Sequence, residues 1–496
     1  MDRRKFIETA GSIIPISTVI PLSVLGLANN GSPDIAGKVE VIPNNETADY
    51  TIRIGTGLVE VADQQIISTT TYNGQFPGPL LTFKEGKRAI VDIHNDTDTP
   101  EQLHWHGQFI PADVDGAAEE GTPYIPPHGM RRETFIPGPS GFRFYHTHTV
   151  ARENLNAAQY TGLVGPVFIE SENRSVNYDR VEFMVLKEFD PYFMRGGDMP
   201  SDFLTGHMVP ELMTMGENAD KESSIKVKGF EVSYKIFTMN GKKLGHGKPI
   251  HVKYGEKILF HILNGSASET RSIALPGHTF KVIELDGFPV PNPSEVPVLW
   301  IGTAERVSAI VEMKNPGVWV MGDLADDDRR NGMGAVIQYA NHKGQPQWVK
   351  PKPFKWDYTR FGKHSQHTSE PDEIIKMTFA KQQAADKGFN RWTINGVAFD
   401  MMNMKPMFHL KEGKRYRLQM RNASDDIHPM HLHRHSFEIT KVGGKYTSGI
   451  VKDVAMLGGY QEMEVDFVAN NPGLTLFHCH MQLHMDFGFM ALFDYI

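Results

Sequence analysis

Apolar and polar residues alternate in short runs along the chain, and three of these runs occupy the same place in a repeated pattern. A period of two residues is typical of half-buried β-strands, because successive side chains of a strand point to opposite faces. Helical periodicity is scarce, so the pattern predicts an all-β protein. The three runs, each followed by an asparagine, are Ala89 to Ile93 before Asn95, Ile258 to Ile262 before Asn264, and Tyr416 to Met420 before Asn422.

The repeat extends on both sides of these runs. Each copy begins with an Asn-Gly turn and closes with a glycine-containing turn and a second strand-like run. We therefore predict three related β-sandwich units at 45–172, 178–342 and 373–496, called the first, middle and third repeats below, with a loose linker at 343–372. The opening turns are Asn73-Gly74, Asn240-Gly241 and Asn395-Gly396, and the closing runs start at Gly141, Gly317 and Gly473.

Length and composition agree with this division. A chain of 496 residues is too long for one hydrophobic core and suits about three domains. Its 40% hydrophobic and 22% charged residues exclude a disordered or fibrous protein. The net charge is −8 and no basic tract follows the first residues, which argues against nucleic acid as a partner.

The N-terminal residues 1–28 have the features of an export signal. Arg3 and Arg4 precede an apolar run from Ile13 to Leu27, which is short and contains two prolines. We interpret this segment as a twin-arginine signal cleaved after Ala28. The mature protein is then expected in the periplasm or otherwise outside the cytoplasm, without stable insertion in a membrane.

Cysteine is almost absent. Cys479 is the single cysteine of the chain, so no intramolecular disulfide can form. A lone thiol in an oxidising compartment is reactive unless something occupies it. Metal ligation would do so.

Ten of the 22 histidines fall in four short clusters at equivalent strand ends of the first and third repeats. Residues i and i+2 of a strand share a face, so each His-x-His pair presents two imidazoles side by side. Eight converging imidazoles are explained most simply by a cluster of metal ions, whereas a structural zinc site takes four ligands. The clusters are His104 and His106; His146 and His148; His428, His431 and His433; and His478, His480 and His484 around Cys479.

Cys479 points to the face opposite to that of its neighbours, so its thiolate serves a second site. His428 and His484 remain to join it. Two histidines and one cysteine are the trigonal ligand set of a blue-copper centre. The His478-Cys479-His480 tripeptide then gives electrons a covalent path from this site to the imidazole cluster.

The middle repeat has no histidines at the corresponding positions. Ser272-Ile273-Ala274 and Gly322-Asp323-Leu324 stand there instead. The fold therefore does not require the histidines, which indicates that they serve chemistry.

These four clusters resemble the four copper motifs of the multicopper oxidases, the family that includes laccases, ascorbate oxidase and bilirubin oxidase. The resemblance covers the whole mature chain and implies three cupredoxin-like Greek-key β-sandwich domains, four copper ions and one-electron oxidation of a reductant coupled to four-electron reduction of dioxygen to water. By this resemblance the type 1 copper is bound by His428, Cys479 and His484, the type 2 copper by His104 and His431, one type 3 copper by His106, His146 and His480, and the other by His148, His433 and His478.

Three further positions follow from the same resemblance. Asp115 corresponds to the family's acidic residue beside the type 2 copper and would supply protons. The glutamate that many bacterial relatives carry after the last type 1 histidine is Met485 in this chain, with Asp486 next, so the second proton donor is left open. Phe489 stands at the axial position of the type 1 copper and cannot coordinate it, which predicts a raised potential, while Met490 is expected to pack in the core.

The substrate is the least determined feature. The leading hypothesis is a laccase-like oxidase of phenols and aromatic amines, and the alternatives are a cuprous or ferrous metallo-oxidase and a copper-sequestering protein without turnover. Methionines at Met401 to Met407 and Met208 to Met215 are candidate soft ligands for Cu(I). Asp425 and Asp426 could hold a phenol hydroxyl or a metal cation near the type 1 site. The sequence leaves the oligomeric state open.

Overall fold

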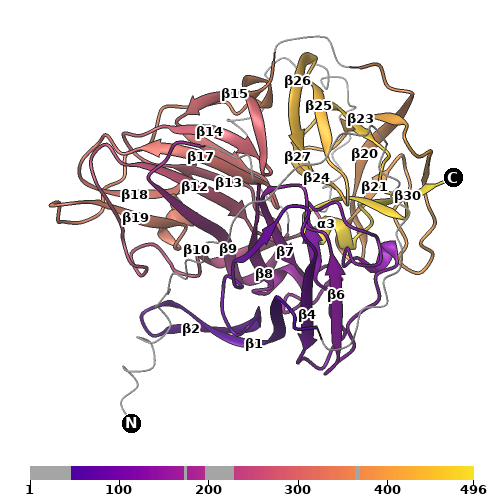
Figure 1. The fold of residues 1–496 in the computed structure, drawn as a ribbon, viewed down its shortest axis with the longest axis horizontal. Coiled ribbons are helices and arrows are strands. Elements are labelled where there is room, and N and C mark those ends of the chain that lie inside the picture. The colour runs from indigo at the N-terminus through magenta and orange to yellow at the C-terminus, as the bar shows by residue number, and fades with distance from the viewer. Residues whose placement is uncertain (1–45, 172–175, 196–227, 364–368) are drawn as a thin grey trace, which may run out of the picture. The chain divides into compact units, whose positions relative to one another are not determined.

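The computed structural model describes residues 46–171, 176–195, 228–363 and 369–496. In these residues strands dominate and helices are short, so the prediction of an all-β protein is confirmed (Figure 1). The described part contains no helix with the length and hydrophobicity that crossing a membrane requires. The predicted signal segment 1–28 and the stretch Met208 to Met215 lie outside the described residues.

The first repeat forms two four-stranded sheets that share one hydrophobic core. One sheet has the order β2-β1-β4-β6 and the other β3-β8-β7-β5, so the chain crosses between them repeatedly. Its core includes Ile52 and Val91 from one sheet and Trp105 and Val167 from the other. The elements are β1 (Tyr50–Ala62), β2 (Gln65–Tyr72), β3 (Leu81–Lys84), β4 (Ala89–Asn95), β5 (His104–His106), β6 (Met130–Phe135), β7 (Gly141–His146) and β8 (Val164–Glu170), with 3-10 turns η2 (Ala118–Glu120) and η3 (Ala158–Tyr160).

The middle and third repeats each contribute six strands to one twelve-stranded sheet, of order β15-β14-β17-β12-β9-β10-β21-β20-β23-β28-β25-β26. The two halves join where β10 pairs with β21 through Phe230 and Phe389. The middle-repeat elements are β9 (Arg180–Arg195), β10 (Phe230–Met239), β11 (Ile250–Val252), β12 (Lys257–Asn264), β13 (Arg271–Ala274), β14 (Phe280–Leu285), β15 (Phe288–Val296), β16 (Val298–Ile301), β17 (Arg306–Glu312), β18 (Val318–Asp323), α2 (Asp326–Arg330) and β19 (Gly334–Tyr339).

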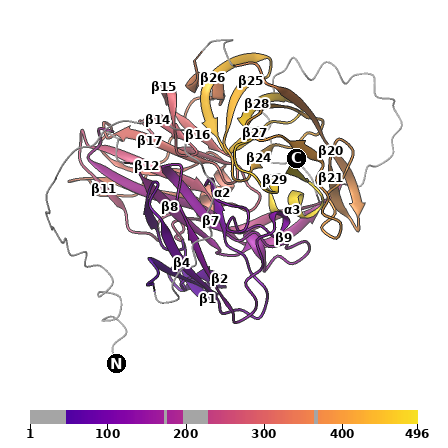
Figure 2. The same ribbon diagram turned by 45° about the vertical axis from the view of Figure 1, so that its right-hand side comes forward.

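Each of these repeats completes its sandwich with a five-stranded sheet. The orders are β11-β19-β18-β13-β16 in the middle repeat and β22-β30-β29-β24-β27 in the third. In Figure 2, α3 lies beside β29 of the latter sheet. The third-repeat elements are β20 (Glu373–Asp386), β21 (Phe389–Ile394), β22 (Phe408–Leu410), β23 (Arg415–Asn422), β24 (His428–Leu432), β25 (Phe437–Val442), β26 (Lys445–Lys452), β27 (Val454–Leu457), β28 (Glu462–Val468), β29 (Thr475–Cys479), α3 (Gln482–Asp486) and β30 (Met490–Tyr495).

The strand pairing repeats three times, as the sequence pattern predicts. The pairs β1 and β4, β9 and β12, and β20 and β23 are parallel, while β5 and β7, β13 and β18, and β24 and β29 are antiparallel. The repeated asparagines have a common role, since each donates from its side chain to the loop that follows its strand. Asn422, for example, donates to the carbonyl oxygen of Asp426 at 2.7 Å and so shapes the entry to β24.

The segment 343–372 is not the loose linker that its composition predicts. Within its described part, Tyr358 and Phe361 of the 3-10 turn η5 (Tyr358–Phe361) are buried, and Trp356 is nearly so. The hydroxyl group of Tyr358 donates to Glu305 of the middle repeat and accepts from the backbone nitrogen of Met456 in the third. Burial of this aromatic surface fixes the segment against both repeats.

Candidate metal centre

Four strand ends bring the predicted histidines together. In the registers of the two small sheets, His104 lies opposite His146 and His431 opposite His478. His148, His433 and His480 follow two residues after a histidine of their strand, and His484 lies on α3. All ten histidines and Cys479 are buried.

The residues of the two predicted type 3 sets lie close together in the structure. In one group, His433 Nε2 and His478 Nε2 are 3.0 Å apart, and His148 completes a trio whose nitrogens lie within 4.8 Å of one another. In the other group, His146 Nε2 lies 3.4 Å from His106 Nδ1 and 3.3 Å from His480 Nε2. Ligand atoms at such separations can be shared by one metal ion.

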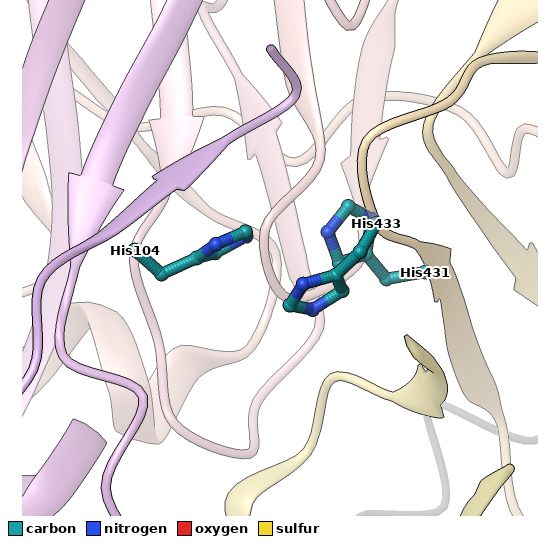
Figure 3. Close-up of side chains that lie close together, drawn as sticks. All are labelled: His104, His431 and His433. Carbon is teal, nitrogen blue, oxygen red and sulfur yellow. The ribbon is translucent and has the colours of Figure 1, made fainter. Parts of the chain in front are cut away.

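His104 and His431, the predicted type 2 pair, face each other from the first and third repeats (Figure 3). Their ring centroids are 5.8 Å apart, and the buried Nε2 atom of each has no hydrogen-bond partner among the described residues. The ring of His433 stacks on that of His104 at 4.1 Å. His433 also forms a trio with His104 and His431 whose ligand atoms lie within 4.8 Å of one another, as well as the trio with His148 and His478.

The hydrogen bonds of these rings fix which nitrogen faces inward. The Nδ1–H groups of His104, His431, His146 and His478 each donate to a backbone carbonyl oxygen, at 2.7 to 2.9 Å. Their Nε2 atoms therefore carry lone pairs, which point toward the other imidazoles. Burial lowers the pKa of His146, His431 and His478 well below the ordinary value, so these imidazoles stay unprotonated. Their nitrogen lone pairs can therefore bind metal ions. The donor set thus fits a cluster of metal ions.

Carboxylates from one loop of the first repeat surround this cluster. Asp115 Oδ2 lies 3.0 Å from His104 Nδ1 and 2.9 Å from His433 Nδ1, so Asp115 touches ligands of two predicted sites. Burial alone would raise the pKa of Asp115, but the neighbouring His104 lowers it below the ordinary value. Glu120 is the reverse case, because burial and the charge of Asp115 raise its pKa well above the ordinary value. A proton on Glu120 that Asp115 accepts satisfies both groups. Glu119 Oε2 approaches His148 Nδ1 at 3.6 Å.

Asp453, between β26 and β27, supports two further ligands. Its carboxylate accepts from His106 Nε2 at 3.1 Å, which leaves His106 Nδ1 as the inward lone pair, and its carbonyl oxygen accepts from His431 Nδ1 at 2.8 Å. Arg306 of the middle repeat holds both carboxylate oxygens, at 2.6 and 2.5 Å. All three repeats thus meet at Asp453, and a middle-repeat cation orients a ligand of the first repeat.

The predicted second site lies on the opposite face of β29. Cys479 Sγ is 3.8 Å from His428 Nδ1 and 3.6 Å from His484 Nδ1. His428 Nε2 bonds to the hydroxyl group of Ser424 at 2.9 Å, which turns its Nδ1 lone pair to the cysteine. The indole of Trp392 packs against both histidines, with ring centroids 4.9 and 4.2 Å away.

Phe489 covers this three-residue site. Its ring centroid lies 4.8 Å from that of His428, and the ring stacks parallel to Trp392. Met490 packs on the other side of the strand in a small apolar cluster with Met485, as the sequence predicts for Met490. The residue at the place of the family's glutamate is therefore surrounded by apolar side chains.

Asp486 stabilises a loop that follows the histidines of β7. Its carboxylate accepts from the backbone nitrogens of Ala151 at 3.0 Å and Arg152 at 2.6 Å, and from the side chain of Gln482 at 2.9 Å. Burial raises its pKa to about 7 despite these donors. Among the described residues, its hydrogen bonds and ion pairs do not reach any of the clustered histidines.

The acidic residues near the three-residue site differ in whether a lysine already pairs with their carboxylates. Asp425 and Asp426 both pair with Lys381, at 2.6 and 2.5 Å, so the same ammonium group already engages both carboxylates. Glu231 of β10, which sequence reasoning did not identify, places Oε2 at 3.9 Å from His484 Nε2 and has a side chain 32% exposed. Glu231 therefore connects the buried site to solvent.

Known proteins resemble this chain along most of its length. Three family models, each described as multicopper oxidase, match residues 53–174, 214–342 and 370–495. A multicopper oxidase of Mycobacterium tuberculosis, MmcO, is 29% identical over 87% of this chain and 84% of its own. The structure of Fet3p, described as a multicopper oxidase that functions in iron import, is similar with a TM-score of 0.71, at 19% identity over 90% of both chains. That of the laccase from Botrytis aclada has a TM-score of 0.69, at 19% identity over 90% of this chain and 87% of its own.

Proposed function

The chain belongs to the multicopper oxidase family, and on that premise we propose that it couples one-electron oxidation of a phenol or aromatic amine to four-electron reduction of dioxygen to water. The observation that carries this proposal is the placement of Cys479 between His478 and His480. One tripeptide thereby links a site at a solvent-facing carboxylate to a buried cluster of eight imidazoles.

We propose four copper ions at the positions that the sequence resemblance implies. His428, Cys479 and His484 would hold the type 1 ion, His104 and His431 the type 2 ion, and the two imidazole trios the type 3 ions. Bound copper would supply one-electron redox chemistry at both sites. Electrons would cross from Cys479 to His478 through the backbone, where the carbonyl oxygen of Cys479 accepts a hydrogen bond from His478 Nδ1 at 2.9 Å.

Protons would reach the cluster through Asp115. Its carboxylate contacts His104 and His433, and among the described residues its second oxygen, Oδ1, is buried without a hydrogen-bond partner. Burial and the charge of Asp115 raise the pKa of Glu120, which favours a proton on this neighbouring acid. The Asp115 and Glu120 pair can therefore hold a proton beside the cluster without a large change in structure. Asp486 is a weaker candidate for this role because backbone donors engage its carboxylate.

Glu231 supports a phenolic or amine substrate. Its Oε1 accepts from the side chain of Asn390 at 2.7 Å, which orients the carboxylate, and its Oε2 lies beside His484. A phenol hydroxyl or an aromatic amine could donate to this oxygen while its ring lies near His484, from which electrons enter. Since Lys381 already engages both Asp425 and Asp426, Glu231 is the carboxylate we assign to substrate.

A cuprous oxidase is the second candidate, and exposed thioethers favour it. Met402 is 92% and Met404 44% exposed, and the partly buried Met401 packs against the cluster that contains Met485. Soft sulfur ligands of this kind suit Cu(I). Sequestration of copper without turnover is the third possibility, and oxygen uptake with a reductant would exclude it.

The test is a comparison of oxygen uptake with phenols, Cu(I) and Fe(II) in the wild type, Glu231→Gln and Met402→Leu/Met404→Leu. We expect the first variant to raise KM for phenols about tenfold or more, through loss of a charged acceptor, and the second to leave phenol oxidation unchanged. Glu412→Gln, an exposed position, is the control for Glu231. Saturable Cu(I) kinetics that the methionine variant abolishes, with poor phenol turnover, would replace the phenol assignment by the cuprous one.

The N-terminal segment also has a proposed role. We propose that residues 1–28 direct the protein out of the cytoplasm, to the periplasm or beyond. The mass of the mature protein should then correspond to cleavage after Ala28, and Arg3→Lys/Arg4→Lys should leave the precursor in the cytoplasm.

A further inference from the structure

A small cavity borders the cluster next to His146 and His480. The volume open to the centre of a water-sized molecule is about 10 Å³, which is room for one water molecule. The first, middle and third repeats all contribute to its lining. The polar residues of the lining are His146, Gln159, Lys187, Asn264, Ser266 and His480.

Two lining residues have hydrogen-bond donors that the protein does not use. Lys187 of β9 is 1% exposed and, among the described residues, its ammonium group forms no ion pair and one hydrogen bond, to the carbonyl oxygen of Gln159. An ammonium group has three N–H donors, so two remain. The side-chain nitrogen of Gln159, a residue 7% exposed, is buried and has no hydrogen-bond partner in the described part of the chain.

The side-chain oxygens of Ser266 and Asn264 in the lining are occupied. Ser266 Oγ accepts from the backbone nitrogen of Glu269 at 2.7 Å and donates to Glu188 at 2.7 Å. Asn264 Oδ1 accepts from the backbone nitrogen of Ser266 at 3.1 Å. Glu188, the acid adjacent in sequence to Lys187, binds Ser266, Ala267 and Arg271. Beside the imidazole nitrogens of His146 and His480, the cavity therefore presents two side chains with unused donors, and one of them carries a buried positive charge that forms no ion pair among the described residues.

Burial of such a charge is costly unless a hydrogen-bond acceptor lies within reach. We propose that the cavity is a binding site for one water molecule or one anion of the same size, such as hydroxide or fluoride, held by Lys187 and Gln159 beside His146 and His480. Its physiological role rests on the proposed function: water formed from dioxygen at the cluster would bind in this site transiently before it leaves the protein. The binding itself does not depend on turnover.

The first test is a high-resolution crystal structure of the copper-loaded protein and of Lys187→Met. Methionine keeps the volume of the side chain and removes its charge, and because Lys187 forms no ion pair among the described residues, the substitution leaves no buried counter-charge behind. We expect a single isolated density peak within hydrogen-bond distance of Lys187 Nζ and Gln159 Nε2 in the wild type, and none in the variant. An empty cavity in the wild type would overturn the proposal.

The second test is a calorimetric titration of the resting copper-loaded protein with fluoride. Lys187→Met should weaken fluoride binding about tenfold or more, and Gln159→Leu should weaken it less, because an ammonium is a stronger donor to an anion than a neutral amide. Lys235→Met is the control, since Lys235 belongs to the same repeat and its side chain is 62% exposed. If fluoride binds only to the metal ions, Lys187→Met and Lys235→Met will have equal affinities, and the proposal is wrong. Neither readout needs catalysis, so a protein without oxidase activity but with an occupied cavity would reject only the proposed function.

Discussion

The middle repeat and its two neighbours have the same strand pairing and different chemistry. Where His104 and His431 stand in β5 and β24, the middle repeat has Ser272 in β13, whose hydroxyl group donates to Asp323 of β18 at 2.7 Å. The hydrogen bond between Ser272 and Asp323 thus satisfies the polar groups at a buried position where the flanking repeats have imidazoles. The β-sandwich therefore forms without histidine ligands at these positions.

The middle repeat is nevertheless not inert. It supplies two buried cations to the cluster, Arg306 through Asp453 and Lys187 through the adjacent cavity. We infer a division of labour in which the flanking repeats bind the metal ions and the middle repeat positions ligands and small molecules around them.

The largest effect should come from Cys479→Ser in the third repeat. Loss of the thiolate removes the blue absorption and the electron path, while the eight imidazoles of the cluster remain. Absorption and electron paramagnetic resonance spectra, with copper analysis, will check this. A variant that keeps an intense blue band would show that the thiolate does not bind the type 1 ion.

Asp115→Asn should have the next largest effect. The substitution keeps the size of the side chain and removes its capacity to ionise, so turnover should fall roughly 10²- to 10⁴-fold. In stopped-flow experiments, anaerobic bleaching of the blue band should stay near the wild-type rate and its return with oxygen should slow. Slower bleaching with normal reoxidation would place Asp115 on the substrate side.

Arg306→Met tests the contribution of the middle repeat. It leaves the buried Asp453 carboxylate with only the more distant Arg143, whose Nη1 lies 3.8 Å away, which should cost about 3–5 kcal/mol of stability. Copper affinity should fall about 10- to 100-fold, as expected when a supporting partner of a ligand is lost. Denaturant titration and copper analysis measure both quantities, with Arg330→Met, whose side chain is 73% exposed, as control. Equal results for the two variants would make the middle repeat a spacer only.

Phe489→Met should have the smallest effect. The ring beside His428 would be replaced by a thioether able to approach the type 1 ion, which should lower its reduction potential and slow oxidation of weakly reducing phenols. Redox titration of the blue band measures the potential. Met490→Leu, in the apolar cluster behind the strand, should leave it unchanged.

The strands and the histidine clusters could be predicted because their signals are local. Alternation marks the strands, the Asn-Gly pairs mark turns in which both residues have positive φ, and i, i+2 spacing puts two imidazoles on one face. Asp115 was identified by its place in a motif, and the structure puts its carboxylate at His104 and His433.

Asp453, Arg306 and Lys187 could not be predicted in this way. Their positions depend on how strands of different repeats meet, and no spacing within one repeat encodes that contact. Glu119 and Glu120 offered a faint signal, as adjacent acids shortly after Asp115, but their burial is a tertiary property. The same holds for the segment 343–372. Its lysines and prolines predict solvent exposure, whereas burial of Tyr358 and Phe361 decides its packing.

Copper stoichiometry of the mature protein tests the central claim most directly. Metal analysis of the purified, copper-loaded protein should give four copper ions per chain together with an intense blue absorption, and the same analysis of His104→Ala/His431→Ala should give fewer ions with the blue band retained. One copper ion per chain, or a colourless protein with four, would contradict the account.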